Sequence, residues 1–146
     1  MTLDELAGLC REAARELAGR EPRPLPATVL LPGQEATELI TLPGFPDDDA
    51  GRAEALAALA EDRVVPRGAP CYGFLAEAEL VDGTDVLLVA YGARRQGAYV
   101  TAAPLGGDAL GEFSEDEALA HGALPFLAPL QRAVDQAEPP DVTRVR

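Results

Sequence analysis

The stretch that decides the fold is residues 71–105, CYGFLAEAELVDGTDVLLVAYGARRQGAYVTAAPL. It predicts three consecutive antiparallel strands, CYGFLAEAEL, TDVLLVAYG and AYVTAAPL, joined by two tight turns. Apolar side chains recur at every second residue from Tyr72 to Leu80, which is the period of a strand with one buried face. Residues 86–91 are apolar on both faces and indicate a central strand covered on both sides. Asp82-Gly83 predicts a type I′ turn, because glycine accepts a positive φ.

The segments before this meander predict a helix and a hairpin. Residues 2–18 carry apolar side chains at three- and four-residue steps, and Thr2 with Glu5 forms a capping box. Three prolines in residues 20–27 favour an extended connector. Residues 27–42 then read as two strands around Pro32-Gly33, a dipeptide that suits a turn.

A second helix is predicted over residues 50–62, after the run Asp47-Asp48-Asp49. Three carboxylates in a row can cap a helix or hold Ca²⁺ or Mg²⁺, but the spacing lacks the alternation and distal Glu of a calcium loop. We therefore interpret the aspartates as caps. Phe45 is expected to pack against this helix as a hydrophobic staple does.

The end of the chain predicts further helices. Residues 110–113 read as a short edge segment, and Ser114 with Glu117 forms a second capping box that predicts a helix over 115–120. The last helix is expected over residues 128–137, with Pro129 near its start. Residues 138–146 are polar and contain prolines, so we expect a flexible C-terminal tail.

Together these elements predict one α+β domain over residues 1–137, in the order α-ββ-α-βββ-α, with helices packed on an antiparallel sheet of about five strands. That order is similar to the Roadblock and profilin-like folds, which implies a scaffold or regulatory role. The likeness lies in the order of elements and not in a motif.

The charge balance excludes some classes of partner. Twelve basic residues, all Arg, stand against 25 acidic ones, for a net charge of −13. Such a surface repels phosphate backbones and anionic lipids, so we expect neither nucleic-acid nor membrane binding. Lys and Asn are absent, which is typical of a bacterial gene from a GC-rich genome.

The cysteines and the N-terminus predict a cytoplasmic protein. Cys10 and Cys71 fit no zinc or CxxC spacing, and we interpret them as buried reduced thiols. Asp4 and Glu5 stand where a signal peptide carries positive charge. The longest strongly apolar run, residues 86–91, is far shorter than a membrane span.

Three features of the sequence are candidates for a chemical site. His121 is the only histidine and has no nucleophile or orienting partner near it in sequence, so we interpret it as a helix-end residue. Glu77 and Glu79 share one strand face and can be an acid–base pair or a solvated face, and we favour the solvated face. Cys71 has no basic neighbour in sequence to stabilise its thiolate. With no dinucleotide or P-loop motif either, we predict no catalytic, cofactor or metal-binding residue.

The function predicted from the sequence is a non-enzymatic protein-binding scaffold or regulatory domain that also forms a homodimer. A sheet edge or the first helix would supply the interface, with Leu6, Arg94 and Arg95 as contact residues; the arginine pair can equally be a solvated hairpin tip. Two alternatives stay open. One is an acidic inhibitor or immunity-type protein that covers a basic partner with the carboxylates of residues 108–138, and the other is an enzyme whose site the sequence does not reveal.

Overall fold

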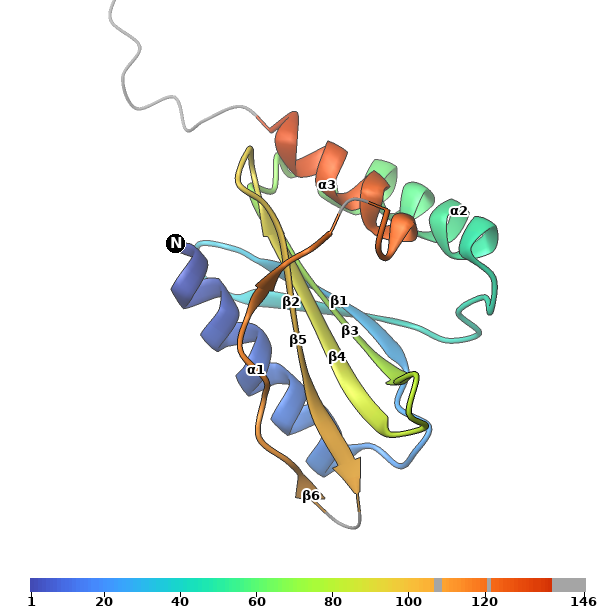
Figure 1. The fold of residues 1–146 in the computed structure, drawn as a ribbon. Helices are drawn as coiled ribbons and strands as arrows, with labels where there is room; N and C mark the ends of the chain where they lie inside the picture. The colour runs from blue at the N-terminus through green and yellow to red at the C-terminus, as the bar shows by residue number, and fades with distance from the viewer. Residues whose placement is uncertain (107–108, 121, 138–146) are drawn as a thin grey trace, which may run out of the picture.

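One antiparallel sheet runs through the molecule with its long strands in the order β2-β1-β3-β4-β5 (Figure 1). The computed structural model describes residues 1–106, 109–120 and 122–137. The five long strands are β1 (Ala27–Pro32), β2 (Thr37–Leu42), β3 (Cys71–Glu79), β4 (Asp85–Ala93) and β5 (Gly97–Gly106). Two short strands, β6 (Ala109–Leu110) and β7 (Glu117–Ala118), pair with the outer side of β5.

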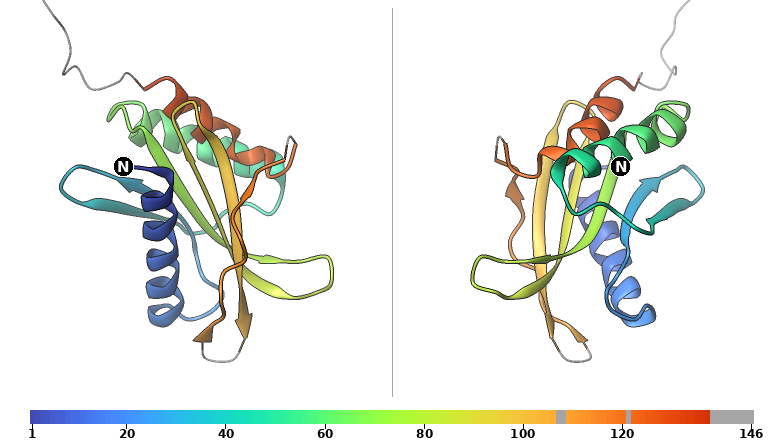
Figure 2. Two further views of the ribbon diagram at one scale, coloured as in Figure 1. Left: turned by 60° about the vertical axis from the view of Figure 1, so that its left-hand side comes forward. Right: turned by 90° about the vertical axis from the view of Figure 1, so that its right-hand side faces the viewer.

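Helices cover both faces of this sheet (Figures 1 and 2). One face carries α1 (Leu3–Arg20), and the other carries α2 (Asp49–Leu59), which continues into the π-helical turn Ala60–Val64, together with α3 (Ala128–Asp135), which follows the 3-10 turn Pro125–Leu127. The sheet is therefore the middle of three layers. The predicted α+β architecture and element order are confirmed.

The capping box predicted for α1 is present. The Glu5 backbone N–H donates to Thr2 Oγ1 at 3.1 Å, and the Thr2 backbone N–H donates to Glu5 Oε1 at 2.9 Å. The helix then buries Leu6, Cys10 and Leu17 against the sheet. Because Gly73 of β3 has no side chain, the Cys10 thiol lies close to the backbone of that strand.

An aromatic cluster holds the opposite layer together. Phe45, Phe74 and Phe126 bring three separate segments into contact, with ring centroids 5.6–6.1 Å apart. Aromatic pairs at such separations add to the gain from burial. Phe45 thus joins the core beside α2, and Asp48 caps that helix by accepting from the Gly51 N–H at 3.0 Å.

The turn between β3 and β4 differs from the predicted type I′ turn. The Gly83 N–H donates to Leu80 O at 2.8 Å, and only Gly83 takes a positive φ, +88°, at this turn. A type I′ turn needs positive φ at both central residues, here Val81 and Asp82. Gly83 is an extra residue between this turn and β4. The Asp82 side chain accepts a hydrogen bond from the Thr84 N–H.

The helix predicted over residues 115–120 was wrong. This region runs extended along β5, and Glu117 belongs to strand β7. Pairing with the sheet edge satisfies the backbone groups that a short helix would have left free at its ends. His121 and the predicted tail over residues 138–146 lie outside the described residues.

Candidate protein-binding edge

The outer edge of β5 is closed along its length. Residues 109–120 form a strap that follows this strand, and three strap N–H groups, from Gly111, Ser114 and Leu119, donate to carbonyls of β5 at 2.8–2.9 Å. The accepting carbonyls belong to Pro104, Ala102 and Ala98. Strands β6 and β7 add their own pairs at either end. No length of β5 within the described chain presents an open edge to solvent.

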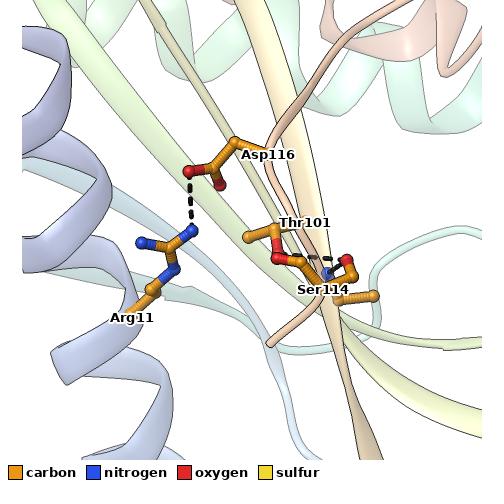
Figure 3. Close-up of polar contacts among 5 residues, drawn as sticks. Arg11, Thr101, Ser114 and Asp116 are labelled. Atoms are coloured by element: carbon orange, nitrogen blue, oxygen red, sulfur yellow. Dashed lines mark hydrogen bonds and ion pairs between the residues drawn. The ribbon is translucent and has the colours of Figure 1, made fainter. Parts of the chain in front are cut away.

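Side chains fasten the strap (Figure 3). Thr101 is buried, and its Oγ1 donates to Ser114 O at 2.6 Å. The Ala102 N–H donates to Ser114 Oγ at 3.1 Å. Arg11 of α1 reaches across to Asp116, with 2.6 Å between Nη2 and Oδ2. Its guanidinium also lies 5.9 Å from the ring centroid of Phe113. The strap is thus bound to the sheet and to α1.

The opposite edge of the sheet, β2, has a free side. Its only strand neighbour in the described structure is β1, with the register Thr37↔Pro32 to Leu42↔Ala27. The Gly33 N–H donates to Ala36 O at 2.9 Å, which marks Gly33–Ala36 as a hydrogen-bonded pair. Hydrogen-bonded pairs alternate along an antiparallel ladder, so the backbone of Glu38, Ile40 and Leu42 faces β1.

It follows that the backbone N–H and C=O groups of Thr37, Leu39 and Thr41 face outward. The pairing of Thr37 with Pro32 agrees with this alternation, since proline has no N–H to donate. No backbone–backbone hydrogen bond outside the ladder is found for these three residues in the described chain. An edge of this kind is a template for another strand.

The side chains of β2 leave the edge accessible. Ile40 and Leu42 pack inward on the α2 side, whereas Leu39 points to the α1 side and is 42% exposed. Natural edge strands are commonly blunted by lysines, prolines or bulges. The strand TELITL has one charged residue, Glu38, and that carboxylate is paired with Arg63 and Arg67.

A hollow of about 990 Å³ lies beside the β1–β2 turn. It is formed by that turn, the loop after the π-helical turn and the end of α3, and its lining includes Gln34, Ala36, Val65, Arg67 and Cys71. Cys71, which the sequence analysis interprets as a buried reduced thiol, lies here. Burial raises the pKa of its thiol, which keeps it protonated and unreactive.

The predicted contact residues are only partly accessible. Leu6 is 1% exposed and packs in the core between α1 and the sheet, so the apolar face of α1 is not an available interface. This corrects the prediction for Leu6: helical periodicity identifies a buried face but does not say what buries it.

Arg95 is exposed at the β4–β5 turn, where its backbone N–H donates to Asp135 Oδ1 at 2.7 Å. Arg94 is partly buried, and its Nε is buried with no hydrogen-bond partner in the described structure.

Glu77 is occupied by structural contacts. Its Oε1 accepts from Arg23 Nε at 2.6 Å, and its Oε2 accepts from the Leu25 N–H at 3.1 Å. Hydrogen bonding to Glu77 raises the pKa of Arg23. Glu79, by contrast, is exposed, so the two carboxylates have different surroundings and do not share one site.

Within the described part of residues 108–138, three carboxylates of the expected acidic surface are exposed and have no ion pair. Asp116 is paired with Arg11, Asp135 accepts from the Arg95 N–H, and Asp108 and Glu138 lie outside the described residues. Glu112, Glu115 and Glu117 remain exposed along the strap.

The open edge of β2 was the candidate binding surface that the sequence located least well. The hairpin itself was predicted, but which of its strands ends the sheet depends on the pairing of β1 with β3.

Comparison with family models, curated proteins and solved structures found no significant match. Within the described residues, no helix combines the length and apolar character of a membrane span, and no group of three His, Cys, Asp or Glu side chains is placed to hold a metal.

Proposed function

We propose that this protein is a non-enzymatic, cytoplasmic protein-binding domain, a scaffold or regulator, that binds a polypeptide strand along the open edge of β2. The observation that carries the proposal is the contrast between the two edges. The β5 edge is covered by a strap held by backbone pairs, a buried threonine and an ion pair, whereas β2 has outward-facing backbone groups. Strand addition to such an edge is a recurring mode of peptide recognition.

The test compares two variants that replace equally exposed leucines. Leu39 of β2 is 42% exposed and Leu80 in the β3–β4 turn is 45% exposed. Tagged wild type, Leu39→Lys and Leu80→Lys are used to recover binding partners from the native host. We expect wild type and Leu80→Lys to recover the same protein and Leu39→Lys to lose it, because lysine on an edge strand disfavours further pairing. Equal recovery by all three proteins would contradict the proposal.

A second candidate is the acidic inhibitor, favoured by the exposed Glu112, Glu115 and Glu117 on the strap. A basic partner bound there would be lost as salt rises, because exposed charges are screened within about 10 Å at 0.1 M salt. Replacing these three residues with Gln should then abolish recovery, while Leu39→Lys should leave it unchanged. The two candidates therefore predict opposite outcomes for the same pair of variants.

A further inference from the structure

The open edge also indicates which strand it binds. Resting on the function proposed above, we infer that β2 pairs with β2 of a second copy, antiparallel and about a two-fold axis that passes beside Leu39. Such an axis is perpendicular to the sheet. The two sheets then form one continuous sheet, with the α1 faces of both copies on the same side. The interface is then isologous, with one patch used twice.

The backbone fixes the register of this pairing. Only Thr37, Leu39 and Thr41 direct their backbone groups outward, so a hydrogen-bonded pair must join two of these residues. Centring the axis on Leu39 uses all three: Leu39 faces Leu39 of the second copy, and each Thr37 faces the other copy's Thr41. These pairs supply about six hydrogen bonds. A shift of two residues toward the C-terminus would place Pro43, which has no N–H, opposite Thr37.

The side chains of β2 match themselves in that register. The strand reads Thr-Glu-Leu-Ile-Thr over residues 37–41, so a threonine stands two positions to either side of Leu39. Each threonine therefore lies opposite another threonine, and the exposed Leu39 covers its symmetry mate. Threonine pairs and apolar pairs across strands both stabilise a sheet.

Charge favours this edge over the remaining surface for self-association. Two copies at −13 each repel, so the surface where they meet must carry little acidic charge. Glu38 is the only acidic residue of β2, and Arg63 and Arg67 of the same copy pair with it. These three side chains sum to a small positive charge in an acidic protein.

The hollow beside the β1–β2 turn enlarges the contact. In the same register, Leu42 of the second copy comes opposite Ala36, which lines the hollow. Val65 also lines it and is 52% exposed. The chain leaving β2 of one copy would therefore pass this hollow in the other copy, which adds apolar area beyond the ladder, as a stable dimer requires.

The experiment measures association and register together. Sedimentation equilibrium should show a dimer for wild type and Leu80→Lys, and a dissociation constant on the order of tenfold or more higher for Leu39→Lys, because that variant sets two like charges directly opposite each other. Register is read from Leu39→Cys with a short bifunctional thiol reagent, which needs no disruption of the dimer. We expect covalent dimers, since the two Cα atoms would be about 5.5 Å apart.

Two further cysteine variants serve as register controls. Thr41→Cys alone should give little cross-linked dimer, since like residues at position 41 are about 13 Å apart in this register, whereas a mixture of Thr37→Cys and Thr41→Cys should cross-link. Leu80→Cys should be modified without forming cross-linked dimer, and the wild type, with its buried Cys10 and Cys71, should form no cross-linked dimer either.

Failure of this inference is distinguishable from failure of the proposed function. A monomeric wild type, or cross-linking at Leu80→Cys as strong as at Leu39→Cys, would overturn the dimer. If such a monomer still lost its host partner on Leu39→Lys, the edge would bind a different strand and the proposed function would stand. A monomer whose partner recovery is unaffected by Leu39→Lys would overturn both.

Discussion

Gly73 sets the distance between α1 and the sheet. A Cβ atom placed at Gly73 would lie 2.5 Å from Cys10 Sγ and 3.3 Å from Leu30 Cβ, and both neighbours are fully buried. We expect Gly73→Ala to lower the free energy of unfolding by about 1–3 kcal/mol, as overpacking does, measured by urea titration. Gly8→Ala is the control, because no atom lies within 4 Å of that position and alanine favours a helix. Equal stability of Gly73→Ala and wild type would show that α1 is not held at this distance.

Buried acidic groups make the fold sensitive to alkaline pH. Burial raises the pKa of the Cys10 thiol to about 12, from an ordinary value near 9, and burial also raises the pKa of Tyr72. In the unfolded chain Cys10 loses its proton above about pH 9, while the folded chain keeps it. The unfolded state then binds fewer protons, so stability falls as pH rises from about 9 to 12.

The measurement is the midpoint of urea unfolding at pH 8 and pH 10, for wild type and Cys10→Ala. We expect a smaller loss of stability between the two pH values in Cys10→Ala, and slow alkylation of both native thiols at pH 8. Rapid alkylation of the folded protein would contradict the burial of Cys10 and Cys71.

At the scale of elements, local signals identified segments well but did not decide between competing pairings. The capping box of α1 was predicted correctly because both of its hydrogen bonds join Thr2 and Glu5, which are three residues apart. Ser114 and Glu117 show the same spacing, yet that segment extends along β5, since Ser114 there bonds to Ala102 and Thr101. Thr101 is 13 residues away, and no local pattern contains that contact.

The strap should therefore open when its buried hydrogen bond is removed. Thr101→Val deletes the donor to Ser114 O, and we expect the free energy of unfolding to fall by about 1 kcal/mol and amide exchange at Ser114 and Leu119 to accelerate. Thr28→Val is a matched control, because Thr28 is also buried and donates to the Pro26 carbonyl. It should cost similar stability without faster exchange in the strap. Unchanged exchange in Thr101→Val would show that backbone pairing alone closes the β5 edge.

At the scale of the whole molecule, charge distinguishes binding of a strand at the β2 edge from binding of a basic partner at the acidic strap. The net charge of −13 was available from the sequence, but the sheet order was not, because β1 pairs with β3 across about forty residues of intervening chain. Only the order shows that the free edge carries a single, neutralised carboxylate. The β2 edge is nearly neutral. Repulsion between two copies therefore comes from the acidic residues on the rest of the surface and not from the interface.

Added salt should therefore strengthen self-association. Raising sodium chloride from about 0.01 M to about 0.15 M shortens the screening length from about 30 Å to about 8 Å, which weakens repulsion between the two acidic copies while the ladder and Leu39 contacts persist. We expect the dimer dissociation constant to fall several-fold, measured by sedimentation equilibrium. Leu80→Lys, which makes each copy less acidic without altering the edge, should show a smaller salt effect. A dissociation constant that rises with salt would mean that opposite charges meet across the interface, and β2, whose one carboxylate is already paired, would not be the surface that brings the copies together.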